Sequence, residues 1–150
     1  MKNPNQELIG SIASPLTGLS KEMLEIGIDE ITDNEVVKKI PILSSIIAGY
    51  RTFIAIREYQ FMKKIMQFLF EQKGLSERER KIWLLKMDEK EQVKIGEVTL
   101  ELLDKVNSMH KAKILGIIFC RLIAGKISSR DYIRVGEWFS PFIRTIWSIF

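Results

Sequence analysis

The sequence predicts an all-α fold: a single compact bundle of five to seven helices with one long central hairpin helix. Residues that start helices recur before successive apolar segments. No stretch alternates apolar and polar residues for long enough to indicate a strand. The breaks between segments are short, so helices adjacent in sequence are expected to pack as neighbours. The 150 residues, 46% of them hydrophobic, suffice for one core and one domain spanning 1–150.

The first part of the chain is expected to contain a loose arm, one helix and a short turn. Residues 1–14 are predicted to form the arm. Ser14 followed by Pro15 is typical of a helix start, because the serine side chain can accept a backbone N–H bond and proline fits the first helical position. This pair predicts a helix over residues 15–31, and a short capped turn follows over 33–39.

The long central helix is predicted over residues 42–72, opened by Pro41 and stopped by Gly74. Its second half has one polar and one apolar side, as a surface helix does. Its first half, 42–56, has no polar stripe and only one charge, Arg51. A helix that is apolar all round must be buried in a core, in a partner or in lipid.

Small residues recur at helical spacing in this first half, which predicts a face that another backbone can approach closely. Three covers are considered for this face: the core, another subunit and lipid. The run 40–56 has 17 residues and would be about 25 Å long as a helix, just short of a bilayer's apolar core. The candidate interaction residues are Ser45, Ala48, Gly49 and Thr52, with Arg51 beside them.

Four further helices are predicted from capping residues in the second half of the chain. Ser76 and Glu79 have the spacing of a capping box, in which each side chain satisfies a free backbone N–H of the other residue. Asp88, Ser108 and Ser128 are placed to cap the three that follow. The predicted ranges are 76–87, 88–106, 108–125 and 128–139, the last being interrupted at Ser140 and Pro141.

The segment 114–120 is apolar on every side and is expected to be the central helix of the bundle. Cys120, the only cysteine, is predicted to be buried and unreactive, and no intramolecular disulfide can form. The first residues lead into no apolar segment of the secretory type. These observations predict a cytoplasmic location, with attachment to the inner face of the membrane as an alternative.

Positive charge is concentrated near the C-terminus. Residues 105–150 hold 8 Lys/Arg against 2 Asp/Glu, whereas residues 1–104 hold 15 against 17. The aromatic tail, 142–150, mixes large apolar rings with arginine, which suits a partner groove or a membrane interface. Stacking on single-stranded nucleic acid and covering one end of the core are the alternatives. The candidate contact residues are Arg134, Trp138, Phe142, Arg144, Trp147 and Phe150.

Catalytic and metal-binding patterns are not found in the sequence. His110 is the only histidine and lies at a predicted helix start, where an exposed surface role is expected. Phosphate-binding glycine loops, paired-histidine zinc motifs and dinucleotide fingerprints do not occur. The sequence therefore predicts a protein that is not an enzyme and has no metal or cofactor.

Two weak resemblances add to this interpretation. The stretch from Asp33 to Lys64, with Lys39-Ile40-Pro41-Ile42 and Ala55-Ile56-Arg57, is similar to a group of small uncharacterised helical bacterial proteins. The segment from Lys94 to Ser128 resembles tellurite-resistance TerB-like domains but lacks their run of acidic metal ligands. Neither resemblance implies a catalytic residue.

The function predicted from these features is non-enzymatic, through self-assembly or through binding to another protein. A membrane-engaging effector that inserts residues 40–56 is the main alternative. Nucleic-acid binding is the third, and less favoured, hypothesis.

Overall fold

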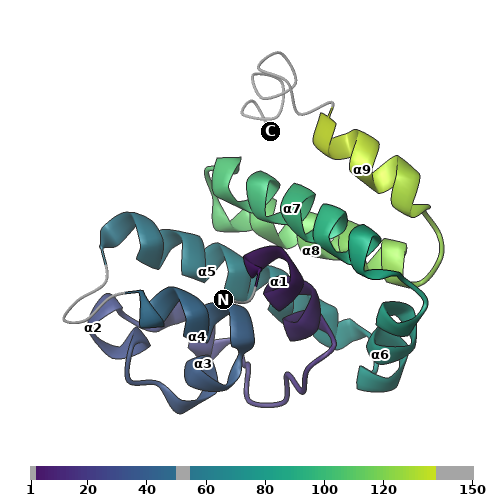
Figure 1. The fold of residues 1–150 in the computed structure, drawn as a ribbon. Coiled ribbons are helices and arrows are strands. Elements are labelled where there is room, and N and C mark those ends of the chain that lie inside the picture. Colours follow the sequence, from purple (N-terminus) through teal and green to yellow (C-terminus); the bar gives the residue numbers. More distant parts are fainter. Residues whose placement is uncertain (1–2, 50–54, 138–150) are drawn as a thin grey trace.

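The computed structural model describes residues 3–49 and 55–137 of the chain. Within these ranges the protein contains nine α-helices, two short 3₁₀ turns (Glu22–Glu25 and Gln72–Gly74) and no strand, which confirms the all-α prediction (Figure 1). The expected number of helices, five to seven, was too low, because residues 4–48 form four short helices. The helices are α1 (Pro4–Ile12), α2 (Ile28–Ile31), α3 (Glu35–Lys39), α4 (Pro41–Ala48), α5 (Ile56–Glu71), α6 (Glu77–Leu85), α7 (Glu89–Lys105), α8 (Met109–Ile123) and α9 (Ser129–Glu137).

The capping residues of the second half act as predicted. Ser76 Oγ accepts the backbone N–H of Glu79 at 3.1 Å, and the Glu79 carboxylate accepts that of Ser76, which completes the capping box. Side-chain oxygens of three further residues accept a backbone N–H three residues along the chain, at the starts of α7, α8 and α9. These residues are Asp88, Ser108 and Ser128.

The N-terminal arm was wrongly predicted. Residues 4–12 form α1, and its apolar side chains Leu8, Ile9 and Ile12 are fully buried. Asn3 caps this helix through a 2.8 Å bond from the Asn5 N–H, and proline occupies the first helical position. No long helix follows Pro15, so the prediction for 15–31 was also wrong. A capping residue type followed by proline occurs both at Asn3-Pro4 and at Ser14-Pro15, and the helix forms where an apolar stripe can reach the core.

The helix predicted over 42–72 is not continuous. Its first part is α4, which ends at Ala48, and its last part is α5, which begins at Ile56 after Ala55 in an extended conformation (φ −70°, ψ 153°). The two helices have different neighbours: α4 packs on α1 and α3, whereas α5 packs mainly along α8 (Figure 1). One long central hairpin helix is therefore replaced by two helices with separate roles in the core.

A buried serine joins α1 to α4. Ser11 Oγ donates to the carbonyl of Glu7 at 2.7 Å and accepts the backbone N–H of Ile42 at 3.0 Å. That N–H belongs to the first turn of α4, where no helical carbonyl is available to it. The serine thus satisfies a buried donor and sets the contact between the two helices.

The ring of Phe119 on α8 lies at the centre of the aromatic core. Phe68 from α5, Trp83 from α6 and Tyr132 from α9 meet it edge to face, with ring centroids 5.1, 5.3 and 5.3 Å away. The buried Tyr132 hydroxyl is 2.6 Å from Thr99 Oγ1 on α7, so this polar atom has a partner as well. Side chains from three other helices therefore converge on Phe119 of α8, although Ile117 on the same helix is exposed, so α8 is not covered on every side.

Two glycines mark places where the backbones of two helices approach closely. A Cβ on Gly96 of α7 would lie 2.7 Å from the carbonyl carbon of Asn5, which belongs to the backbone of α1. A Cβ on Gly116 of α8 would lie 2.9 Å from the Glu71 Cβ and 3.0 Å from the Phe68 carbonyl oxygen on α5. Real Cβ atoms do not approach other atoms so closely, so both helix pairs require glycine at these positions.

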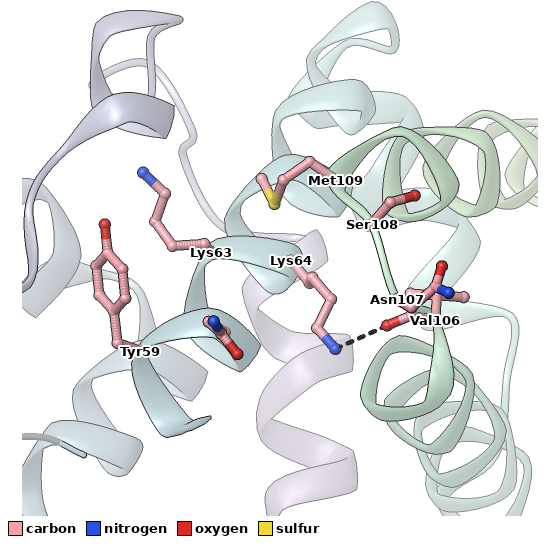
Figure 2. Close-up of a pocket in the computed structure, with 8 residues that line it drawn as sticks. Tyr59, Lys63, Lys64, Val106, Asn107, Ser108 and Met109 are labelled. Carbon is pink, nitrogen blue, oxygen red and sulfur yellow. Dashed lines mark hydrogen bonds between the residues drawn. The ribbon is translucent and has the colours of Figure 1, made fainter. Parts of the chain in front are cut away.

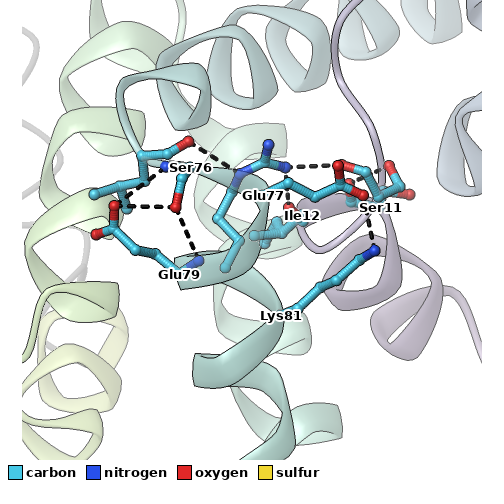
Figure 3. A network of polar contacts seen from close by, with 9 residues as sticks. Ser11, Ile12, Ser76, Glu77, Glu79 and Lys81 are labelled. Atoms are coloured by element: carbon cyan, nitrogen blue, oxygen red, sulfur yellow. Dashed lines mark hydrogen bonds and ion pairs between the residues drawn. The ribbon is translucent and has the colours of Figure 1, made fainter.

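Arg80 joins α6 to the end of α1 and the residues just after it, and Figure 3 shows the polar network around Ser11, Ile12 and Ser76. Its side chain is 4% exposed and donates to the carbonyls of Ile12 at 2.7 Å and Ser14 at 2.8 Å, with a longer bond to Leu75. The Ile12 carbonyl belongs to the last turn of α1 and the Ser14 carbonyl lies just beyond it, where helical partners have run out. The buried guanidinium therefore stabilises the irregular segment after α1 by saturating its backbone acceptors.

Cys120 is expected to react slowly with thiol reagents, although it is only half-buried rather than fully buried as predicted. Burial, followed by the nearby Glu71 carboxylate, raises the pKa of the thiol to about 11. Because the thiolate is the reactive form, alkylation at a pH of about 8 should be roughly a hundredfold slower than for an ordinary thiol. Timed mass spectrometry of the native protein measures this rate, with the urea-unfolded chain as control. Equal rates in the two states would contradict the expectation.

Candidate interaction site

The helix α4 buries one side and turns its small residues outward. Ile42 and Leu43 are buried in the core, whereas Ser45, Ala48 and Gly49 are exposed. A Cβ on Gly49 would meet only the carbonyl oxygen of Ile46, three residues earlier in the chain, at 3.4 Å. Of the three covers considered for this face, the core of the same chain is therefore ruled out for the part of the face that the structure describes. The other two residues of the face, Arg51 and Thr52, lie outside the described residues.

A groove of about 540 Å³ lies between α4, α5 and α7, with Ile46 as its α4 residue and Pro4 of α1 at its edge. Its floor is apolar and consists of partly buried side chains, one from each of these three helices. Its rim is charged. We call this feature the α4–α5 groove; its floor is formed by Ile46, Phe61 and Leu100, and its rim includes Arg57, Glu101 and Asp104.

The rim charges are of both signs. Arg57 Nη2 is 3.7 Å from Asp104 Oδ2, and the two side chains are 81% and 48% exposed. A pair so open to water contributes little to stability, about 0–1 kcal/mol. Ile56, directly before Arg57 at the start of α5, is 68% exposed. An apolar floor bounded by charged side chains is the usual composition of a protein-binding surface.

The predicted tail contacts fall largely outside the described residues. Arg134 is exposed on α9. Trp138, Phe142, Arg144, Trp147 and Phe150 belong to the part that the structure does not describe, so the tail contact remains a prediction. His110 is exposed at the start of α8, as expected for a surface residue.

The length of α4 bears on the membrane hypothesis. With eight residues it is about 12 Å long, far less than the thickness of a bilayer core. In residues 3–49 and 55–137, no helix combines the length and the hydropathy needed to cross a membrane.

Sequence reasoning did not find the groove, because its floor combines residues from three helices. Phe61 lies on the apolar side of an ordinary surface helix, and Leu100 belongs to a similar stripe on α7. In its sequence pattern, neither apolar stripe differs from a stripe that the core covers completely. The only available signal was the helical spacing of the small residues on α4, which was interpreted as a face for close contact.

Comparison with known proteins adds no relative to this description. No family model matches the chain, and no curated protein or solved structure shows significant similarity to it. The resemblances noted in the sequence stay predictions. The case for a functional site therefore depends on the geometry of the α4–α5 groove and the residues around it.

Proposed function

We propose that the protein is not an enzyme and acts through self-assembly, with a second copy of the chain bound at the α4–α5 groove. The observations that support this most are a groove with an apolar floor and the exposed small residues of α4, the helix that contributes Ile46 to that floor. Covering such a surface removes apolar area from water, at roughly 25 cal/mol per Å². The short side chains of Ser45 and Ala48 leave room for the backbone of a partner helix to come close.

The mixed charges of the rim favour a second copy over an unrelated partner. In a two-fold symmetric dimer both copies use the same patch to form the interface, so the patch must be complementary to itself. Arg57 and Asp104 meet this condition, because Arg57 of one copy can pair with Asp104 of the other. Their exposed contact within one chain is weak, so exchanging it for a contact between chains costs little.

The variant Ala48→Arg is expected to weaken self-association at least about tenfold, or 1.4 kcal/mol, because a long charged side chain would occupy the space of the partner backbone. Its thermal stability should match that of the wild type, since Ala48 is exposed. Size exclusion with light scattering over a concentration series measures the association. The matched control is Ala124→Arg, an exposed alanine at the end of α8.

A charge exchange tests the symmetric arrangement further. Arg57→Glu should separate the copies, and adding Asp104→Arg to that variant should restore them. A wild-type chain that is monomeric at about 100 μM would refute self-assembly. If that monomer released dye from liposomes, insertion of residues 40–56 would be the better hypothesis.

A further inference from the structure

A second pocket lies between α5 and the connection from α7 to α8. Its volume is about 500 Å³, within the range of pockets that hold small organic ligands, about 300–1,000 Å³. Lys63 and Lys64 of α5 line one wall, and Asn107, Ser108 and Met109 line the facing connection (Figure 2). None of these residues lines the α4–α5 groove, so a ligand of this pocket is independent of self-assembly.

The two lysine side chains diverge toward opposite ends of this pocket. At one end Lys63 Nζ donates to the carbonyl of Ile26 at 3.2 Å and lies 5.7 Å from the centre of the Tyr59 ring. At the other end Lys64 Nζ donates to the carbonyl of Val106 at 3.0 Å. Neighbouring residues of an α-helix point about 100° apart, so two side chains about 6 Å long place their tips roughly 10–13 Å apart. The pocket therefore has two separate cationic ends.

Neither ammonium group is neutralised by direct contact. Within the described ranges no carboxylate lies at ion-pair distance from Lys63 or Lys64. Burial lowers the pKa of both amines, and the more distant charges of Glu25 near Lys63 and Asp104 near Lys64 oppose that effect in part. Arg57 adds a further positive charge near Lys64. Lysine is rarely as buried as Lys63, which is 9% exposed, unless it is paired. Each end therefore suits an added carboxylate.

Both ammonium groups retain N–H donors for such a carboxylate. Each carries three N–H groups, of which Lys63 uses one for a backbone carbonyl and Lys64 uses two. Asn107 directly follows Val106, the carbonyl partner of Lys64. Its side-chain oxygen accepts from Lys111 Nζ at 2.9 Å, which leaves its N–H₂ group as a further donor at this end.

The surface between the two ends is apolar. The Met109 side chain extends into this space from the α7–α8 connection, and the Tyr59 ring lies on the opposite side (Figure 2). The Tyr59 hydroxyl donates to the carbonyl of Ile26 at 2.6 Å, so the tyrosine offers its ring rather than a free polar group. Methionine is unbranched and adapts to irregular shapes. A flexible hydrocarbon chain therefore suits the space between the two cations.

We propose that this pocket binds a linear α,ω-dicarboxylate, with one carboxylate at the Lys63 end and the other at the Lys64 end. Each carboxylate accepts a charge-assisted hydrogen bond of about 2.7–2.9 Å from its ammonium group. The two bonds take up about 6 Å of the roughly 10–13 Å between the lysine tips. An extended chain advances about 1.2 Å per bond, so diacids of about five to seven carbons span the remainder.

Calorimetric titration of the full chain with adipate, the diacid of six carbons, tests this proposal. A dissociation constant of about 0.1–1 mM is expected. Monomethyl adipate, in which one carboxylate is blocked, should bind at least about tenfold more weakly. In a series from malonate to sebacate, the affinity should be highest at about five to seven carbons. These comparisons use only the wild-type protein, so they do not depend on the folding of a variant.

Substitutions at the two ends test which residues hold the ligand. Lys63→Met and Lys64→Met should each weaken adipate binding at least about tenfold. Each variant should also bind adipate and its monomethyl ester about equally, because only one carboxylate then meets an ammonium group. Lys126→Met, at an exposed lysine beyond α8, removes the same charge and should bind like the wild type.

Asn107→Asp separates binding from folding, since Lys63 and Lys64 also hold backbone carbonyls. Asn107 is exposed, so this substitution should not lower the melting temperature, whereas its carboxylate would compete with the ligand at the Lys64 end. Its affinity for adipate should fall at least about tenfold. The proposal would be overturned by a lack of adipate binding at about 10 mM, by equal wild-type affinity for the monoester, by a series without a maximum, or by unchanged affinity in all three pocket variants.

Discussion

Gly96→Ala is expected to lower the free energy of unfolding by about 2 kcal/mol. An added methyl group would press against the backbone of Asn5, so α1 and α7 would have to separate. Overpacking of this kind costs about 1–3 kcal/mol, occasionally more. Because alanine is intrinsically better than glycine in a helix by about 1 kcal/mol, a net loss can come only from the contact. Urea denaturation followed by circular dichroism measures the change.

Gly10→Ala is the matched control for this substitution. Gly10 also lies within a helix, α1, but nothing is within 4 Å of a Cβ built there. This variant should be more stable than the wild type by about 0.5–1 kcal/mol. If the two variants changed stability in the same direction, the close approach of α1 and α7 would be wrong.

Arg80→Ala is expected to cost about 3 kcal/mol, the second large effect. The substitution leaves the carbonyls of Ile12 and Ser14 without their donor. An unpartnered buried acceptor costs about 1–3 kcal/mol, and part of the arginine stem's packing is lost as well. Arg78→Ala, an exposed arginine on the same helix, should change stability by less than about 0.5 kcal/mol.

Thermal unfolding of Arg80→Ala and Arg78→Ala, measured side by side, tests whether the buried guanidinium contributes this stability. Hydrogen exchange adds a local readout, since residues 12–19 should lose protection in Arg80→Ala before the rest of the chain. A stability loss no larger than that of Arg78→Ala would show that the buried guanidinium is dispensable.

The second half of the fold could be predicted because its signals are local. Ser76, Asp88 and Ser108 each cap a helix through a residue three positions away, and such pairs can be recognised in the sequence. The first half depends on distant contacts. The helix α1 forms at residues 4–12 because α7 and α4 cover its apolar side, and nothing near Pro4 in the sequence distinguishes it from Pro15.

The candidate site likewise combines a local signal, which the sequence shows, with distant contacts, which it does not show. The small residues of α4 were found from their spacing, but spacing does not tell whether Ala48 points into the core or away from it. Close packing by glycine does occur in this protein, at Gly96 and Gly116 rather than at Gly49. Which glycine lies in a contact depends on the crossing of two helices, and that is set by the whole core.

The pairing of α1 with α7 also sets an order of events during synthesis. The residues of α1 are made before those of α7, and Gly96 follows Asn5 by about 90 residues, which takes about 5–20 s at the usual rates of translation. The helix α4 is completed earlier, and Ser11 can hold α1 against it meanwhile. The apolar side of α1 that later meets α7 stays open throughout that interval. Nascent chains of this protein should therefore be bound by chaperones until α7 has emerged from the ribosome and released once it has.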